Sequence, residues 1–395
     1  MKKTTKIITI IASIMIITGI LLTVIGYFSG AKLTLTRDGN GFKIYDSGNQ
    51  ISESFSLDPF SKIEGNLNDF DFEIIPSTEY KLEITRQEDQ SITHKIKDHT
   101  LYLNEEASKG AIININLDFF SFPQSVIKLH VPKDAVFSAV ELVSAYGDVH
   151  IADITSTNFT IEANNGDMDL NGINSDQLTI TNRYGDIIAD EIKGEQTKFI
   201  SNDGSLSLKR LDVNTLNVTN NYGDIDAEDI MSYETTISMD NGDITLMNVD
   251  TTNLQISNHY GDMSGQSIDT EQLSLTLTDG DLTLNKVNAN KAVINNQYGD
   301  LLLRQFNSQA LDIQNNSGDV TLEGTLLGTS RVHAEYGDIQ LILKNKQSEL
   351  NYRIQSEFGD ITVNNESFEG NVTQRADSNH QLNITAEDGD VNLQF

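Results

Sequence analysis

Residues 222–244 read YGDIDAEDIMSYETTISMDNGDI, and the turn that opens this stretch also closes it, because Tyr222-Gly223-Asp224-Ile225 returns as Asn241-Gly242-Asp243-Ile244. The two glycines are 19 residues apart, and this spacing occurs ten times in succession. The series consists of Gly147, Gly166, Gly185, Gly204, Gly223, Gly242, Gly261, Gly280, Gly299, Gly318 and Gly337, of which Gly204 alone precedes Ser and not Asp. The spacing then loosens to 22 residues at Gly359 and 30 at Gly389. So strict a period indicates a repeat architecture.

Apolar residues recur at fixed places within each unit. With the residue before each glycine counted as position 1, position 4 is always apolar and position 9 usually is. Position 16 is β-branched or Leu. In the unit that begins at Tyr184 we assign this position to Ile200, which has Phe199 beside it. Positions 4 and 6 alternate with polar residues, as do 14 and 16, which is the period of a strand and not of a helix. Each unit is therefore predicted to form two short strands joined by a polar bend.

Nineteen residues in strand conformation trace a contour of about 60 Å, which suits one coil of a parallel β-solenoid, or β-helix. Eleven such coils would make a rod about 53 Å long. A second period of 38 residues also exists, because tyrosine occupies position 1 in alternate units, and position 6 is small in three tyrosine units (Ala189, Ala227, Gly265) but Leu in the units between them. A propeller with 38-residue blades would satisfy that period too. The solenoid is favoured because positions 4 and 16 recur every 19 residues.

The regions outside the repeat differ in composition. All four prolines lie between residues 59 and 132. We expect a stalk at 29–50, an N-terminal β region or cap at 51–145, the solenoid at 146–357, and irregular C-terminal coils or a cap at 358–395. Within the N-terminal β region the strand-like runs are Phe70–Ile75, Tyr80–Thr85, Thr100–Leu103, Ile112–Leu117, Val126–Val131 and Val136–Val143.

The first residues predict a membrane anchor. Residues 1–6 carry three lysines and no acid, and Ile7 to Phe28 are 22 residues without a charge. As a helix these residues would span about 33 Å, enough to cross a bilayer. The lysines predict a cytoplasmic N-terminus and an extracellular remainder, in a single-pass protein of the cell membrane. A cleaved signal peptide ending near Ser29-Gly30-Ala31 is the alternative, and either reading exports the rest of the chain.

The chain is strongly acidic. Lys and Arg number 27 against 58 Asp and Glu, a formal charge of −31. Without the three lysines before the anchor, 24 basic residues face 58 acidic ones, and the exported part carries −34. Such a surface repels phosphate backbones, which excludes nucleic acid as a partner. The absence of cysteine excludes disulfides, thiolate metal sites and cysteine nucleophiles.

Two features of the sequence together resemble a known family. The segment 126–134, VIKLHVPKD, precedes repeated hydrophobic-x-Asn-x-x-Gly-Asp-Ile units. This order, behind a membrane anchor, resembles the bacterial "putative adhesin" β-strand-repeat family, a domain of unknown function, over about residues 50–395. The resemblance implies a surface-exposed protein similar to the LiaG- and LiaX-like envelope-stress proteins of Gram-positive bacteria, some of which respond to cationic antimicrobial peptides. It implies no catalytic residues.

Two rows of side chains are candidates for binding. The repeated aspartates either cap their turns or form a ladder that binds cations, and they are Asp148, Asp167, Asp186, Asp224, Asp243, Asp262, Asp281, Asp300, Asp319 and Asp338. The repeated tyrosines either pack to close a corner, the favoured interpretation, or form an interaction surface, and they are Tyr146, Tyr184, Tyr222, Tyr260, Tyr298 and Tyr336, with Phe358 next.

Nothing else in the sequence points to catalysis. The seven histidines show no repeat register or metal-binding spacing, and motifs for a serine hydrolase, a nucleotide phosphate or a dinucleotide are missing. A β-helical lyase or hydrolase acting on carbohydrate is the alternative, and would require carboxylates gathered around a basic residue such as Lys209, Arg210, Lys286, Lys291 or Arg304. We therefore expect a non-enzymatic, adhesin-like interaction or stress-sensing module without a cofactor or resident metal. Its expected partners are envelope proteins, cell-wall glycan or cationic peptides.

Overall fold

The computed structural model describes residues 12–19, 21–22, 34–38, 41–44, 50–88, 90–106, 113–116 and 125–395. Residues 12–19 and 21–22 are helical, and among the described residues no helix is both long and apolar enough to cross a membrane. The flanks of the predicted span at 7–28, residues 1–6, and most of the predicted stalk lie outside the described residues.

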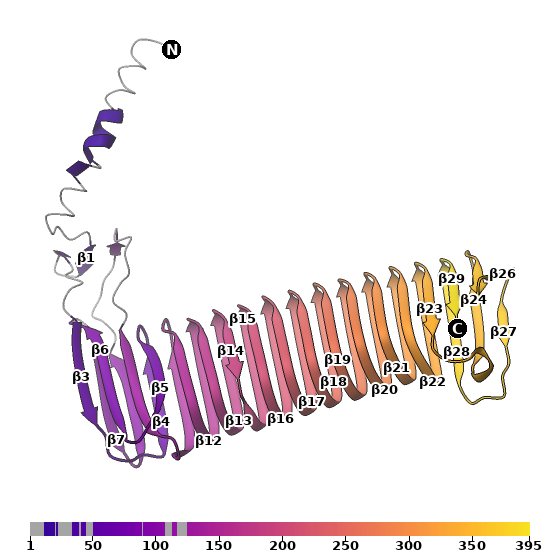
Figure 1. Ribbon diagram of the computed structural model, residues 1–395. Coiled ribbons are helices and arrows are strands. Elements are labelled where there is room, and N and C mark those ends of the chain that lie inside the picture. Colours follow the sequence, from indigo (N-terminus) through magenta and orange to yellow (C-terminus); the bar gives the residue numbers. More distant parts are fainter. Residues whose placement is uncertain are drawn as a thin grey trace, which may run out of the picture.

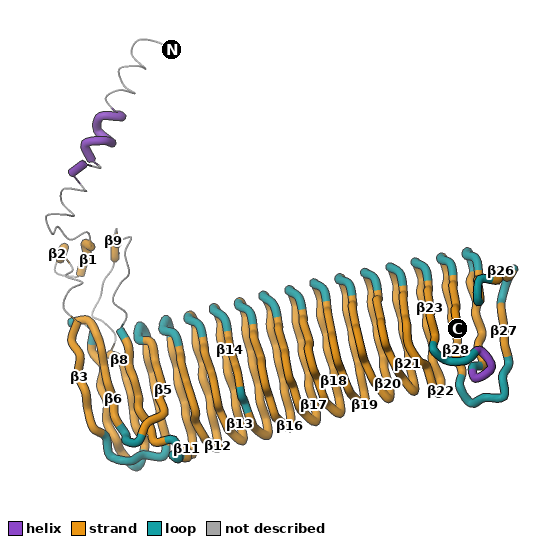
Figure 2. Tube along the Cα trace, in the orientation of Figure 1, coloured by secondary structure: helices purple, strands orange, loops and turns teal. Residues whose placement is uncertain are grey.

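The repeat forms a rod of stacked parallel coils (Figures 1 and 2). Its strands are β12 (Val149–Asn165), β13 (Met168–Tyr184), β14 (Ile187–Asp190), β15 (Lys193–Asp203), β16 (Leu206–Tyr222), β17 (Ile225–Asn241), β18 (Ile244–Tyr260), β19 (Met263–Asp279), β20 (Leu282–Tyr298), β21 (Leu301–Ser317) and β22 (Val320–Tyr336). Residues 19 apart are Cα partners in parallel ladders, as Ile225 is with Ile244. The β-solenoid with 19-residue coils is therefore confirmed, and the 38-residue propeller blade is wrong.

Most units form one continuous strand of 17 residues, so the expectation of two short strands per unit is wrong except where β14 and β15 divide. The chain bends at position 8, where the residue takes the left-handed conformation and drops out of the pairing. Nine coils share this feature, with φ between 49° and 66°, at Asp153, Gly172, Glu191, Arg210, Asp229, Asn248, Ser267, Lys286 and Gln305. The pairing is also interrupted at positions 12 and 19. Each coil therefore has three paired segments, at positions 4–7, 9–11 and from 13 to 18.

The core is a stack of apolar side chains inside the coils. Positions 4, 9 and 16 are buried along the rod, and at position 6 Ala227 lies between Leu208 and Leu246 of the neighbouring coils. Alternation of large and small side chains lets neighbouring layers interdigitate at constant volume. One assignment is corrected: Phe199, and not Ile200, is buried at position 16, because the parallel register sets Phe199 between Ile180 and Val218.

The repeated glycine lies where the backbones of successive coils approach closely. Gly261 has φ +129°, and a Cβ built on it would lie 2.1 Å from the carbonyl oxygen of Gly242. Both the conformation and the contact exclude any larger residue. The same relation joins each glycine of the series to the one before it.

The N-terminal β region continues the stack with irregular coils. Its strands are β3 (Gln50–Ser56), β4 (Lys62–Leu67), β5 (Asp71–Ser77), β6 (Lys81–Gln87), β7 (Ser91–Lys97), β8 (Thr100–Glu106), β10 (Val126–Pro132) and β11 (Val136–Ser144). β11 joins β12 to β4, and β5 joins β12 to β10, all in parallel. The antiparallel pairs β3–β6 and β7–β8 close this end. Three further strands, β1 (Thr34–Asp38), β2 (Gly41–Ile44) and β9 (Ile113–Asn116), form an antiparallel sheet of their own.

Carboxylates terminate the glycine corner in this region. The Asp71 carboxylate accepts a hydrogen bond from the Asp148 backbone N–H at 2.9 Å, and the Glu105 carboxylate accepts the N–H groups of Asn68 and Asp69 at 2.5 and 2.9 Å. Burial raises the pKa of both carboxyl groups, and the backbone donors partly oppose that rise. Asp71 thus takes the place that the preceding coil's aspartate has in the rod, and Glu105 binds the amides of the corner before it.

The C-terminal coils do not stack in sequence order. The elements are β23 (Ile339–Leu343), a short 3₁₀ helix (Gln347–Glu349), β24 (Asn351–Ser356), β25 (Ile361–Val363), β26 (Glu366–Phe368), β27 (Val372–Gln374), β28 (Gln381–Asp388) and β29 (Val391–Gln394). β28 and β29 insert between β22–β23 on one side and β24–β25 on the other. The antiparallel strands β26 and β27 then pair with β25 and β24 (Figure 1). The loosened spacing at Gly359 and Gly389 follows from this insertion.

Replacing one corner glycine tests the packing of the coils. Gly261→Ala is expected to lower the free energy of unfolding by at least about 2 kcal/mol, because the methyl group meets backbone and not a flexible side chain. The matched control is Gly172→Asn, also at a left-handed position, where equivalent coils carry residues such as Asn248. Chemical denaturation should place the control within about 1 kcal/mol of the parent. Equal losses in the two variants would contradict this account of the corner.

Candidate binding surfaces

The repeated aspartates form a hydrogen-bonded ladder along the glycine corner. In most steps of the rod, the Oδ1 atom of one aspartate accepts the backbone N–H of the next coil's residue at the same position, at 2.8–3.0 Å. Asp262, for example, accepts the N–H of Asp281 at 2.9 Å. Ser205 interrupts the ladder, and its hydroxyl accepts from Asp224 at 3.4 Å. These hydrogen bonds are the ones expected of aspartates that cap their turns.

Cation binding by this ladder stays a prediction. Within the part of the chain that the structure describes, no three His, Asp or Glu side chains gather in a group that could hold a metal ion. Successive aspartates are one coil apart, about 4.8 Å along the stack. The ladder thus offers single carboxylates in a line and not a closed coordination shell.

Buried asparagines tie the corner together from inside, a role that sequence reasoning missed. The Asn258 Nδ2 atom donates to the carbonyl oxygens of Gly242 and Gly261, at 3.2 and 2.9 Å. Asn182 and Asn220 make the same pair of bonds in their own coils. These asparagines are the first residue of the recurring Asn-x-Tyr-Gly-Asp segment, so the motif itself was the available signal. Each one satisfies the glycine carbonyls that the close approach of the coils buries.

The tyrosines form a row of exposed rings along the same corner. Their exposed fractions range from 41% at Tyr184 to 62% at Tyr146, and Phe358 is 71% exposed. The rings are therefore partly exposed and partly packed, and their role as an interaction surface stays a prediction. We call this set the aromatic row: Tyr146, Tyr184, Tyr222, Tyr260, Tyr298, Tyr336 and Phe358.

Polar residues separate the rings of the aromatic row. In the parallel register each tyrosine faces a short polar residue of the next coil, as Tyr260 faces Asp279 and Tyr298 faces Ser317. The inserted strand β28 preserves this alternation, because Tyr336 pairs with Asp388 and the Phe358 N–H donates to the neighbouring Glu387 carbonyl. The rings are therefore two coils apart even where the sequence spacing breaks down.

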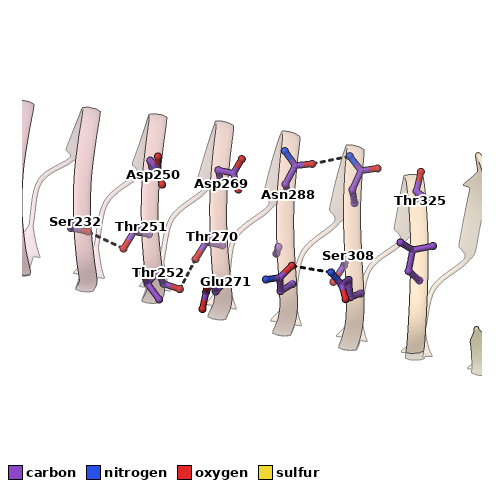
Figure 3. Close-up of a pocket in the computed structure, with 15 residues that line it drawn as sticks. Ser232, Asp250, Thr251, Thr252, Asp269, Thr270, Glu271, Asn288, Ser308 and Thr325 are labelled. Carbon is purple, nitrogen blue, oxygen red and sulfur yellow. Dashed lines mark hydrogen bonds between the residues drawn. The ribbon is translucent and has the colours of Figure 1, made fainter.

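A groove extends across several adjacent coils, along the side chains at positions 10–12. Its larger part has a volume of about 690 Å³ and is bordered by polar side chains of β17 to β22 (Figure 3). Among them, the Ser232 hydroxyl donates to the Thr251 hydroxyl at 2.8 Å, and the Thr270 hydroxyl donates to the Thr252 carbonyl at 3.2 Å. A second part of about 440 Å³ continues it toward β13 and also includes Ser232.

The groove is acidic. We call it the acidic groove, and its carboxylates are exposed and number six: Asp176, Glu195, Asp212, Asp250, Asp269 and Glu271. None of the residues that the structure places along its two parts is Lys, Arg or His. Sequence reasoning missed this groove, because acids occupy positions 10 and 12 in only some units.

Most basic residues of the rod lie elsewhere, but Lys193 is at position 10, where it pairs in the register with Asn174 and Asp212 along the acidic groove. Arg210 is at the left-handed bend, where its guanidinium pairs with the carboxylates of Asp190 and Glu191 at 2.6 and 3.3 Å. The Lys209 ammonium lies 3.8 Å from the Glu228 carboxylate. A carbohydrate lyase requires several carboxylates around one basic side chain in a groove. The residues along the acidic groove do not form this arrangement.

Comparison with known proteins gives one family. The family model described as Toastrack DUF4097 matches residues 60–235 and again 231–394. No curated protein matches the chain.

Solved structures provide weaker similarities. A "putative adhesin" from Bacteroides fragilis is 18% identical, with a TM-score of 0.39, over 59% of this chain and 97% of that one. A "putative cell adhesion protein" from Clostridium sporogenes is 11% identical, with a TM-score of 0.19, over 88% and 99%. A "putative lipid binding protein" from Parabacteroides distasonis is 13% identical, with a TM-score of 0.26, over 88% and 97%. None of the three is described as an enzyme, and TM-scores this low determine no function.

Two substitutions at Asp262 separate the capping role from a charge-dependent one. Asp262→Ala removes the acceptor for the Asp281 N–H and is expected to lower the free energy of unfolding by about 0.5–1.5 kcal/mol. Asp262→Asn keeps an Oδ1 acceptor and should remain within about 0.5 kcal/mol of the parent. Thermal unfolding with and without calcium measures both. An Asn variant as unstable as the Ala variant, with loss of a calcium-dependent rise in Tm, would instead support the cation ladder.

Proposed function

Because the chain belongs to the Toastrack DUF4097 family and folds over the matched residues into a β-solenoid, we propose that it is a non-enzymatic interaction module of the cell surface. The rod presents repeated side chains in straight lines, an arrangement that suits extended ligands more than a single reacting group. Such a ligand contacts several coils at once, and its affinity rises with the number of coils engaged.

The acidic groove is the observation that supports this function best. Its six carboxylates lie along the rod and outnumber the single lysine at positions 10–12 of these coils, Lys193. Carboxylates in a concave surface focus their field and attract cations at long range. An extended polycation would place successive positive charges against successive coils. We propose that cationic antimicrobial peptides are the ligands and that their binding serves a response to envelope stress.

The arrangement of charges favours binding over catalysis. Hydrolysis or elimination on a glycan requires an acid and a base placed around one bond. In the acidic groove Asp250 and Asp269 are partners in adjacent coils, and the hydroxyls of Thr251 and Thr270 bond to neighbouring protein oxygens. This pattern repeats along the groove and singles out no reaction centre.

The proposed location follows from the sequence of the first thirty residues. The uncharged run at 7–28, behind three lysines, supports a single-pass anchor with the solenoid outside the cell. An acidic rod outside the membrane meets cationic peptides before they reach the anionic lipid surface.

Single-cysteine labelling tests this topology cleanly, because the parent chain has no cysteine. On whole cells, Ser47→Cys should react with an impermeant thiol reagent, and Thr4→Cys should react only after lysis. The reverse pattern would refute an extracellular solenoid. N-terminal sequencing of the mature protein provides the control, since a start near Lys32 would indicate a cleaved signal peptide.

Polycation binding is tested with the soluble fragment 32–395 and decalysine as the probe. We expect saturable binding at low salt that weakens at least about tenfold at physiological ionic strength, because screened Coulomb attraction supplies the affinity. The groove variant Asp176→Asn, Asp212→Asn, Asp250→Asn, Asp269→Asn should weaken binding at low salt by a similar factor. Isothermal titration calorimetry measures both effects.

A matched control removes the same charge outside the groove. Its four substitutions are Glu162→Gln, Asp226→Asn, Glu366→Gln and Glu369→Gln, all at exposed positions. This control should bind decalysine nearly as the parent does. If the two variants lose affinity equally, net charge and not the groove attracts polycations, and an absence of binding at low salt would remove the sensing role.

A further inference from the structure

The aromatic row has a regular spacing of its own. Coils of a parallel solenoid stack about 4.8 Å apart, so rings on alternate coils recur about every 10 Å. Seven exposed rings follow this spacing along one corner, and the polar residues between them are short: Asn165, Asp203, Asn241, Asp279, Ser317 and Asp388. A ligand that contacts the row must therefore repeat over the same distance.

A second groove lies beside the row. It has a volume of about 480 Å³, and Gln297 and Glu335 on its border immediately precede Tyr298 and Tyr336. We call it the amide groove, because most of its exposed or half-buried border is uncharged and polar: Thr276, Thr278, Asn295, Gln297, Gln314 and Asn316, with His333 and Glu335 as its titratable residues. The Asn316 Oδ1 atom has no hydrogen-bond partner within the described residues.

Aromatic rings and amides side by side suit a sugar polymer. The C–H groups on one face of a pyranose ring pack against an aromatic face, whose quadrupole attracts them. The hydroxyl and acetamido groups at the edge of the sugar need donors and acceptors, which Asn, Gln and Thr provide. In the fold, the rings are on the corner and the amides are directly beside it.

The distance between neighbouring rings of the aromatic row favours one type of glycosidic linkage. In an extended β-1,4-linked glycan each sugar is turned by half a revolution relative to the last, so the same face recurs every second sugar. Two sugars of such a chain extend over close to the distance between neighbouring rings of the row. An α-1,4-linked chain curls and cannot follow a straight row. Because the exported part of the chain carries −34, an acidic polymer would be repelled, which favours a neutral one.

We propose that the aromatic row and the amide groove bind a neutral, extended β-1,4-linked glycan, with one disaccharide for each pair of coils. The proposal rests on the role of the rod as an interaction module, and it assigns a surface distinct from the acidic groove. Two rings also have neighbours that shape their sites: the Arg183 guanidinium lies 5.5 Å from the Tyr184 ring centroid, and the His259 ring lies 5.1 Å from that of Tyr260.

The test uses the full chain in detergent, with chitobiose, chitotetraose and chitohexaose as probes. We expect each added disaccharide to tighten Kd at least five-fold, because each reaches a further ring. The variant Tyr260→Ala, Tyr298→Ala, Tyr336→Ala should bind chitohexaose at least tenfold more weakly. Tyr233→Ala is the matched control, since Tyr233 is 57% exposed but lies off the row, and it should leave Kd unchanged.

A second variant tests the spacing and not merely the number of rings. The pair Tyr298→Ser and Ser317→Tyr keeps the composition but moves one ring to the neighbouring coil. It should bind chitohexaose as weakly as Tyr298→Ser alone. Circular dichroism and thermal unfolding check that each variant is folded, and Tyr298→Phe should retain binding if stacking supplies the affinity.

Several outcomes would overturn the proposal. These are absence of saturable chitohexaose binding, equal binding of maltohexaose, Tyr variants that bind as the parent does, or retained affinity in the displaced-ring pair. A change in oligomeric state on losing the tyrosines, measured by sedimentation, would assign the row to contacts between copies of the chain instead. Chitohexaose binding should vary less than twofold between low and physiological salt, so failure here and failure of polycation binding are separate results.

Discussion

The rod depends on the close approach of two glycine backbones at one corner. At Gly261 and its equivalents, a carbonyl oxygen of the previous coil occupies the space that any Cβ would need. The close approach at this corner also places the N–H of each following aspartate within reach of the carboxylate one coil earlier. Buried asparagines such as Asn258 then satisfy the glycine carbonyls. A period of 19 residues is the result of returning to this corner after one full coil.

The sequence predicted the parts of the fold that repeat. The glycine series, the apolar positions 4, 9 and 16 and the alternation at position 6 gave the coil length and the core, because each is tested many times along the chain. The continuous strand was missed because the left-handed bend at position 8 accepts residues as different as Asp153, Arg210 and Lys286. Ile200 was misplaced because it adjoins Phe199 and both are apolar, so that only the pairing with Val218 identifies the buried one.

The binding surfaces were predicted less well, for a related reason. The aspartate and tyrosine rows were visible as repeats, but the exposure of the tyrosines depends on how the coils stack. The acidic groove is formed by positions 10–12 of several adjacent coils, and no single unit contains it. The alternation of rings through Asp388 to Phe358 required strand β28 to enter the stack out of order. Pairing between residues 52 apart has no signature in the repeat itself.

That out-of-order strand also has a consequence for how the chain is made. A ribosome or an export channel delivers residues from the N-terminus onward, and coils of a solenoid can form as they emerge. β22 and β24 must nevertheless wait for β28, the partner that lies between them, which follows both in the sequence. Until then β22 presents an open parallel edge, the kind that recruits strands from other chains. Closure of the C-terminal coils thus requires residues 381–388, and a chain cut short before residue 381 would keep this edge of β22 open to strands of other chains.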